Sequence, residues 1–436
     1  MGFLWIVLGI AACIALVILL WMCSMHRNMP WQNCLAALSN LKIRLPGFLK
    51  QYALSGERDY STLPDPLVMA DGTPVTAKEQ FPARREEILR LFEKHVYGAL
   101  PRSGFRTSFE VVEEGDALDG TAIRRQVKIT VSTEKGSSDA LMALYRPKTA
   151  QKVPAIVGLN FRGNHTVLSD KALLPSYCLD ISDGKWEGKR GCCTYRWNIA
   201  DSVARGYAVA TVYSADFAPD QKGNYDSRVA GLFAEPEFKA IGSWAFGILR
   251  MVDYLMEDPS IDHDRIAVVG HSRLGKAAVW AGANDERIGL VISNDSGNSG
   301  ASLSRGNHGE TIYTINMAFP HWFCSEYQKY VKNEKVLPVD QNLLLACMAP
   351  RKLYVASAEE DLWSDPQGAF FSLKSAAKAF AMYHAEVLPE EMKTYPPVGK
   401  AFHCESMGAH IRGGGHDITA EDWKHYLNFM DQYFAD

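Results

Sequence analysis

The stretch RIAVVGHSRLGKAAVWAGA, residues 265–283, decides the fold of this chain. It begins with a short apolar run, passes through Gly270, His271 and Ser272, and continues in a segment whose composition is typical of a helix. A continuous apolar run of this length predicts a strand that is covered on both faces of a sheet. The stretch therefore predicts a strand that turns sharply into a helix, with Ser272 at the turn.

The segments on either side repeat this alternation of strand and helix. Apolar runs at residues 153–161, 288–295 and 352–361 predict further buried strands. The patterns at residues 237–256 and 366–383 predict amphipathic helices. Alternating strands and helices favour a mostly parallel sheet with helices on both faces, so the expected fold class is α/β.

Ser272 is the candidate nucleophile. A serine at a sharp strand-to-helix turn projects its hydroxyl above the sheet, where backbone N–H groups of the helix start face a developing oxyanion. The usual G-x-S-x-G spacing is not met, because Leu274 stands at the place of the second glycine and Gly275 follows one residue later. The alternative is a serine that caps a helix after a core strand.

The order of polar residues along the chain favours a catalytic triad on an α/β-hydrolase fold, a three-layer α-β-α sandwich. In that fold the nucleophile is followed by an acid and then by a histidine. His416 follows three glycines and precedes the last predicted helix, so it is the expected general base. Asp361 and Asp295 each follow a predicted strand and compete as the acid that orients the imidazole. We favour Asp361 and keep Asp295 as the alternative.

Two cations accompany the candidate nucleophile. Arg273 is adjacent to Ser272, and Lys276 lies one helical turn further on, so Lys276 shares a helix face with Ser272. Positive charge at the start of a helix opposes the helix dipole, which favours a functional reason for both residues. They could stabilise an oxyanion or bind an anionic substrate; the alternative is a solvated helix start.

The N-terminus predicts a membrane anchor. Residues 2–22 contain no charged side chain and are almost wholly apolar, and about 20 such residues suffice to span a bilayer. A cleaved signal would usually have a basic start and a shorter apolar core. We therefore expect a transmembrane anchor or signal-anchor over residues 1–23, a tether and N-terminal extension over residues 24–75, and the catalytic domain over residues 76–436.

Charge and cysteine spacing give no indication of nucleic-acid binding or of a zinc site. The net charge is −4, so no strongly basic surface indicates nucleic-acid binding. The chain has nine cysteines, but no Cys or His pair has the spacing of a zinc site. We expect neither a metal nor another cofactor.

The chain resembles the glucuronoyl esterases, carbohydrate esterase family 15, particularly bacterial members. Matching segments extend from about residue 60 to 430, and they include GLNFRGNHT, GHSRLGKAAVWAGA, HGETI, EEDLWSDPQG and HIRGGGHDIT. The resemblance implies an α/β-hydrolase without metal that cleaves esters between 4-O-methyl-glucuronic acid on xylan and lignin alcohols. It thus implies a serine esterase, a carboxylic ester hydrolase that forms an acyl-enzyme through a Ser-His-Asp triad.

The same resemblance implies roles for individual residues. Ser272 would be the nucleophile, His416 the base, and Arg273 part of the oxyanion hole. Lys276 would hydrogen-bond sugar hydroxyls, and Glu310 and Trp363 would line the sugar site. Some members carry a glutamate as the acid at the position of Asp295, and others use an aspartate at the position of Asp361.

The family context also bears on localisation and on rival functions. Its members act outside the cell or in the periplasm, so we expect a membrane-anchored enzyme that faces the periplasm or the exterior. The basic residues that follow the apolar segment, beginning with Arg27, favour the opposite orientation. The alternatives are an esterase of other specificity, such as an acetyl xylan esterase, and a catalytically silent, membrane-bound carbohydrate-binding protein on a hydrolase scaffold.

Overall fold

The described part of the chain begins after the predicted anchor. The computed structural model describes residues 31–40, 49, 58–182, 184–384, 387–389, 392 and 394–434. The anchor predicted over residues 1–23 lies outside these residues. Within them, no helix combines the length and the apolar character that crossing a membrane requires.

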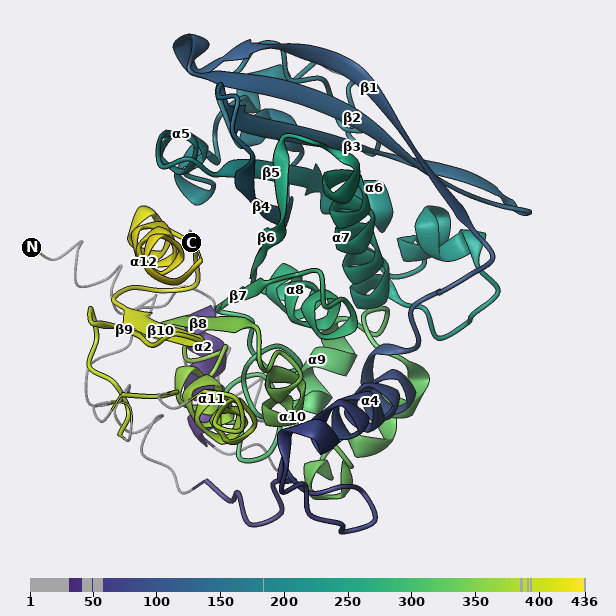
Figure 1. Cartoon of the computed structure of the whole chain (residues 1–436). Coiled ribbons are helices and arrows are strands. Elements are labelled where there is room, and N and C mark those ends of the chain that lie inside the picture. The colour runs from purple at the N-terminus through teal and green to yellow at the C-terminus, as the bar shows by residue number, and fades with distance from the viewer. Residues whose placement is uncertain are drawn as a thin grey trace, which may run out of the picture.

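A ten-stranded sheet forms the middle of the molecule (Figure 1). Its strands are β1 (Arg106–Ala117), β2 (Ala122–Thr133), β3 (Gly136–Pro147), β4 (Val153–Asn160), β5 (Ala208–Tyr213), β6 (Ile261–His271), β7 (Leu290–Asn294), β8 (Lys352–Ala358), β9 (Ala401–His403) and β10 (Met407–Arg412). They lie in the order β1-β2-β3-β5-β4-β6-β7-β8-β10-β9. Neighbours from β5 to β10 in this order pair in parallel, whereas β1 to β3 and β9 are antiparallel additions at the two edges.

Helices cover both faces of this sheet. The helices of the described part of the chain are α2 (Trp31–Asn40), α4 (Phe81–Phe92), α5 (Ile199–Ala204), α6 (Ser214–Phe217), α7 (Ala240–Glu257), α8 (Arg273–Asn284), α9 (Ile312–Ala318), α10 (Gln341–Ala346), α11 (Pro366–Phe380) and α12 (Ala420–Tyr433). One hydrophobic core joins one face of the sheet to α4, α7, α8, α10 and α11. A second core joins the other face to α5 and α12. The prediction of an α/β fold with a mostly parallel sheet between two helical layers is confirmed.

The residues before the glycine run that precedes His416 form a strand, β10, which was not among the strands expected from the sequence. Ile411 and Arg412 belong to β10, which pairs in parallel with β8, so the loop starts only at Gly413. The hydrophobic pattern of the sequence does not predict this strand, because the polar residues His410 and Arg412 interrupt its apolar run. Both are buried, and both contact the Asp422 carboxylate of α12, His410 at 2.9 Å and Arg412 at 2.8 Å.

Parts of the predicted tether pack against the catalytic domain. The Arg58 guanidinium forms two hydrogen bonds of 2.7 Å with the Asp365 carboxylate at the start of α11. In α2, Leu35 and Leu38 are buried in a small cluster with Leu362. The chain therefore contacts the hydrolase fold well before residue 76.

Candidate active site

Ser272 occupies a strained turn between β6 and α8. Its backbone angles are φ 58° and ψ −131°, a conformation that non-glycine residues rarely adopt. Its N–H donates to the carbonyl of Asn294 at the end of β7, at 2.9 Å. The turn thus raises the serine side chain at the carboxyl end of the strand, as in the nucleophile elbow of hydrolases.

Two glycines let the strand and the helix of this elbow meet. A Cβ atom on Gly270 would lie 2.2 Å from the carbonyl oxygen of Leu274. A Cβ atom on Gly275 would lie 2.8 Å from the Cβ of Ser296 and 2.9 Å from the carbonyl oxygen of Gly270. The close approach therefore falls on Gly275 rather than on residue 274, so the spacing G-x-S-x-x-G serves this turn.

Ser272, His416 and Asp361 form a hydrogen-bonded chain. The Oγ of Ser272 is 2.8 Å from Nε2 of His416, and Nδ1 of His416 is 2.5 Å from Oδ2 of Asp361. The hydroxyl of Ser364 also donates to Asp361, and its backbone N–H donates to the other carboxylate oxygen at 3.3 Å. Nucleophile, base and orienting acid thus stand in the geometry of a catalytic triad.

The charge of the neighbouring carboxylates acts on His416. Burial is the largest single effect and lowers the pKa of the imidazole, but the neighbouring carboxylates together outweigh it and raise that pKa above its ordinary value. Asp361 contributes most of this rise, and Asp295 and Glu310 act in the same direction. The surroundings therefore favour the imidazolium form of His416, which is the form that a general base adopts once it has taken a proton.

Asp295 lies close to the triad but has other partners. Its Oδ1 accepts the backbone N–H of Ala358 at 2.7 Å, and its Oδ2 is 3.4 Å from Nη2 of Arg412. Burial and the nearby Asp361 carboxylate raise the pKa of Asp295 well above its usual range. The structure thus gives the bond to Nδ1 of His416 to Asp361, and Asp295 joins the end of β7 to the end of β8.

Arg412 holds the loop that carries His416, a role that the sequence did not reveal. Its guanidinium donates to the carbonyls of Gly413 at 2.9 Å and of Gly415 at 3.0 Å, and also to the carbonyl of Asp417. The same side chain is tied to Asp422 at 2.8 Å. One buried cation therefore fixes an otherwise glycine-rich backbone around the histidine.

Arg273 is held over the mouth of the site by a carboxylate that the sequence analysis missed. Its guanidinium pairs with Asp220, which also accepts hydrogen bonds from Nε2 of His321 at 2.9 Å and Nε1 of Trp322 at 2.7 Å. The guanidinium also lies 5.4 Å from the ring centroid of Trp322 and 5.6 Å from that of Phe161. These contacts keep the guanidinium in the wall of the pocket that Ser272 also lines.

Lys276 is buried and fully used by the protein. Its ammonium donates to the carbonyls of Ser296 at 2.7 Å and Asn298 at 2.6 Å, and to Oε2 of Glu310 at 2.9 Å. An ammonium has three N–H donors, so all of them have acceptors in this structure. Nε1 of Trp363 donates to the other Glu310 oxygen at 3.3 Å. Lys276 therefore holds the Glu310 carboxylate in place and has no N–H donor left over for a ligand.

A pocket of about 150 Å³ opens in front of Ser272. It is lined by all the predicted site residues except Asp361, which lies behind His416. Its remaining lining residues are Asn40, Ser296, Gly297, Phe319, Trp322 and Ser364. A charged pair at the base and aromatic rings at the side are features of a pocket that binds a polar ring compound.

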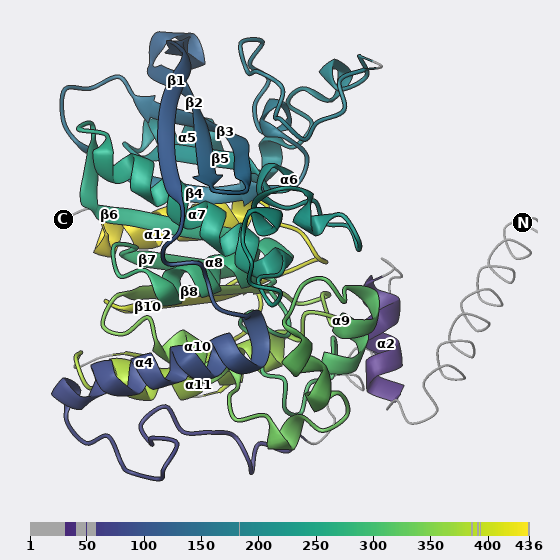
Figure 2. The ribbon, with the colours of Figure 1, turned by 90° about the vertical axis from the view of Figure 1, so that its right-hand side faces the viewer.

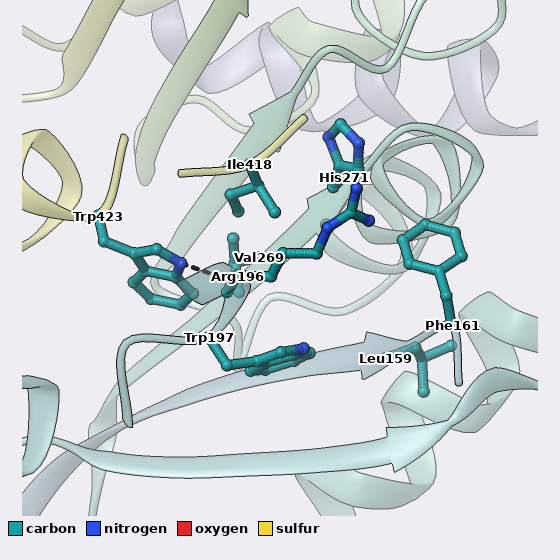
Figure 3. Close-up of a pocket in the computed structure, with 9 residues that line it drawn as sticks. Leu159, Phe161, Arg196, Trp197, Val269, His271, Ile418 and Trp423 are labelled. Atoms are coloured by element: carbon teal, nitrogen blue, oxygen red, sulfur yellow. Dashed lines mark hydrogen bonds between the residues drawn. The ribbon is translucent and has the colours of Figure 1, made fainter. Parts of the chain in front are cut away.

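A second, smaller crevice is lined by residues from the ends of β4 and β6 and from the start of α12 (Figure 3). It is lined by Phe161, Arg196, Trp197, His271 and Trp423 among others, and it holds about 30 Å³, which is space for about one water molecule. The ring of His271 in its wall is 4.6 Å from the ring of His416. The crevice is too small for a sugar, so the larger pocket is the candidate substrate site.

Asp295, Asp361 and His416 form a group whose ligand atoms lie within 4.8 Å of one another. In the described part of the chain it is the one group of three such side chains close enough to share an ion. However, Nδ1 of His416 and Oδ2 of Asp361 are already 2.5 Å apart, the distance of a strong hydrogen bond. The arrangement therefore suits an Nδ1–H of His416 that donates to the Asp361 carboxylate.

Comparison with known proteins identifies relatives of the whole domain. The profile described as "Glucuronyl esterase, fungi" matches residues 196–384. Carbohydrate esterase MZ0003, from an unidentified prokaryote, is 40% identical over 391 residues, which cover 86% of this chain and 90% of that protein. A 4-O-methyl-glucuronoyl methylesterase of Phanerochaete chrysosporium is 29% identical over 335 residues, 74% of this chain and 62% of that protein.

A solved structure agrees with the sequence relatives. The glucuronoyl esterase from Solibacter usitatus superposes with a TM-score of 0.79 at 37% identity, covering 87% of this chain and 99% of that one. The shared fold thus extends over nearly the whole of that chain.

Proposed function

Since this chain belongs to carbohydrate esterase family 15, the glucuronoyl esterases, we propose that it hydrolyses esters of 4-O-methyl-glucuronic acid by acyl transfer through Ser272. The family membership makes the chain a carboxylic ester hydrolase, which confirms the expectation from its sequence. The substrate class that we propose is a carbohydrate uronate ester, such as the glucuronoyl esters that join xylan to lignin alcohols.

The first half of the reaction forms an acyl-enzyme. His416 takes the proton of Ser272 through Nε2 as the serine oxygen attacks the ester carbonyl. The Asp361 carboxylate holds the Nδ1–H and stabilises the imidazolium. The Arg273 guanidinium and the N–H groups at the start of α8 face the oxyanion as it develops.

The second half releases the acid. The alcohol leaves with the proton from His416, and a water molecule, deprotonated by the same imidazole, attacks the acyl carbon. The oxyanion forms and collapses again, and Ser272 recovers its proton. The free glucuronate then leaves the pocket.

The observation that carries this proposal is the contact of 2.8 Å between Ser272 and His416 beside the pocket with the Lys276–Glu310 pair. The pair lies at the base of a pocket that also contains Trp363. Hydroxyl groups of a sugar can bond to the Glu310 carboxylate, and the ring can pack against the aromatic wall. A bare acyl group would leave the remaining acceptor capacity of the Glu310 carboxylate unused, although both of its oxygens already accept one hydrogen bond from the protein.

The test is the Ser272→Ala variant with benzyl glucuronate as the substrate. We expect the variant to lose hydrolysis by at least about a thousandfold while its unfolding curve stays like that of the wild type, because only the nucleophile is removed. Rate and urea unfolding are the two measurements. Activity close to that of the wild type would refute the assignment of Ser272.

Two further measurements separate the rival functions. An ester panel compares benzyl glucuronate with acetylated xylan and simple aryl acetates; an esterase of other specificity would prefer the acetates. A fluorophosphonate probe labels an activated serine, so a silent carbohydrate-binding protein would remain unlabelled. We expect preference for the uronate ester, and labelling that requires Ser272.

We also propose that residues 1–23 hold the protein in a membrane, with the catalytic domain over residues 76–436 facing the periplasm or the exterior. What supports this is the length and apolar character of residues 2–22. Fractionation of cells that produce the full-length protein measures this directly. Recovery in the soluble fraction after gentle lysis would contradict the anchor.

A further inference from the structure

Asn40 brings a polar group into the pocket from outside the predicted catalytic domain. It is the last residue of α2, and it lines the pocket together with Ser272, His416 and Glu310. Its side chain is exposed. A side chain that lies far from the triad in sequence thus faces the same space as the nucleophile.

The helix α2 is docked on the loop that carries the acid. Leu35 and Leu38 are each 6% exposed, and both lie in one cluster with Leu362. Leu362 stands between Asp361 of the triad and Trp363 of the pocket wall. Figure 2 shows α2 at the edge of the domain. Packing at Leu362 therefore sets where Asn40 lies.

The chemistry of the pocket gives an amide there a specific use. The three donors of Lys276 already have acceptors, and Glu310 can only accept hydrogen bonds while it is ionised. A sugar hydroxyl both donates and accepts. The amide of Asn40 has two N–H donors and one carbonyl acceptor, so it can complement a hydroxyl that points away from the Glu310 carboxylate.

The size of the pocket also fits the binding of a single sugar ring. Its volume of about 150 Å³ is well below the ~300 Å³ at the lower end for pockets that enclose drug-sized ligands. A space of this size suits one ring rather than a run of linked sugars. The pocket therefore matches a single uronosyl ring in size, and Asn40 of α2 is part of its wall.

We propose that Asn40 is a specificity-determining residue, which α2 presents so that its amide hydrogen-bonds a ring hydroxyl of the uronate. This inference rests on the proposed function and names a group that selects the acyl sugar. The helix acts as a fixed wall of the pocket, and its hydrophobic face keeps that wall against the Asp361–Trp363 loop.

The experiment compares Asn40→Ala with Ser39→Ala in the full-length protein. Ser39 is the matched control, because its hydroxyl donates to the carbonyl of Ala36 within α2 at 2.6 Å and it does not line the pocket. For methyl glucuronate, we expect Asn40→Ala to raise KM about three- to tenfold with kcat little changed, which corresponds to one lost hydrogen bond. For an aryl acetate, which has no sugar, neither variant should change kcat/KM.

A second variant separates the helix from the pocket. Leu38→Asp places a charge in the cluster with Leu362, so α2 should leave its site. We expect it to raise KM for methyl glucuronate at least as much as Asn40→Ala does. An unchanged KM in both Asn40→Ala and Leu38→Asp would overturn the inference, as would an equal rise in Ser39→Ala.

Binding separates this inference from the proposed function. Calorimetry measures the affinity of free glucuronate for Ser272→Ala and for the double variant with Asn40→Ala, and it needs no turnover. A three- to tenfold weaker affinity in the double variant supports the role of Asn40, and equal affinity overturns it. Failure of the wild type to hydrolyse uronate esters refutes the proposed activity alone.

Discussion

His416 makes a different contact with each of its ring nitrogens. Nε2 lies 2.8 Å from the serine hydroxyl, and Nδ1 lies 2.5 Å from Asp361. The second bond sets the tautomer, because Nδ1 must carry the proton that the carboxylate accepts. The imidazole therefore meets Ser272 with its basic nitrogen.

The pH profile should report this histidine. Protonated His416 cannot accept the serine proton, so kcat/KM should fall as the pH drops through the pKa of the imidazole. Since Asp361 raises that pKa against the effect of burial, the acidic limb should lie above the ordinary value of about 6.5 for histidine. In Asp361→Asn we expect the limb to move to lower pH and kcat to fall by a factor on the order of 10⁴.

Asp295→Asn is the matched control for this prediction. The neighbouring charge and burial favour the neutral form of Asp295, and an amide oxygen can still accept the N–H of Ala358. We expect a loss of less than about tenfold in kcat, because an amide is close in shape to the protonated acid. If Asp295→Asn proved the more damaging change, the acid would have to be reassigned to residue 295.

At the scale of secondary-structure elements, the crossing of β6 and α8 shapes the nucleophile turn. The strand and the helix approach each other at Gly270 and Gly275, where any side chain would collide with backbone. The glycine that seemed displaced in the sequence is thus the one that the packing requires. The shift by one residue follows from the helix starting at Arg273.

We expect Gly275→Ala to strain this crossing. The added methyl would sit 2.8 Å from the Cβ of Ser296 and 2.9 Å from the Gly270 carbonyl oxygen, so the helix must move. The free energy of unfolding should fall by about 1–3 kcal/mol, and kcat/KM should fall as the serine turns away. Urea unfolding and initial rates measure both effects.

Gly188→Ala is the control for the Gly275→Ala variant. No heavy atom lies within 4 Å of a Cβ built at Gly188, and its φ is not positive, so an alanine fits there. We expect wild-type stability and rate. Equal stability and equal rates of Gly275→Ala and Gly188→Ala would contradict the prediction, because they would show that β6 and α8 can accommodate a methyl group at residue 275.

The strand that leads into the His416 loop is an element that the hydrophobic pattern of the sequence did not predict. The glycine run predicted a tight loop that carries the histidine, and His416 does lie in a loop, which runs from Gly413 to the start of α12 at Ala420. The sequence did not predict β10, since His410 and Arg412 interrupt its apolar pattern. Their burial depends on Asp422, a residue of the last helix, which no local pattern could pair with them.

At the scale of the whole molecule, the N-terminal extension is partly docked on the catalytic domain. Arg58 and Asp365 form a buried pair, with side chains 6% and 1% exposed. Asp365 also accepts the N–H of Gly368 in the first turn of α11. The pair therefore connects the extension to the helix that follows the Asp361–Trp363 loop.

Arg58→Met should destabilise the whole domain. The substitution leaves the Asp365 carboxylate buried without its cation, which typically costs about 3–5 kcal/mol. We expect the urea midpoint to fall clearly. The control is Lys335→Met, which removes the ion-pair partner of Asp59, a residue of the N-terminal extension. Because the Lys335 side chain is 65% exposed, this variant should keep a urea midpoint near the wild-type value. Similar midpoints for the two variants would contradict a structural role for the buried pair.

The sequence by itself determined the alternation of strands and helices, the strand–serine–helix turn and the order of Ser272, Asp361 and His416. These follow from hydrophobic periodicity and local turn chemistry, which act over a few residues. Only the tertiary structure decided which aspartate meets His416, which carboxylate holds Arg273, and that Asn40 reaches the pocket. Such contacts join residues far apart in the chain, and their distances depend on how the packed layers bring loop ends together.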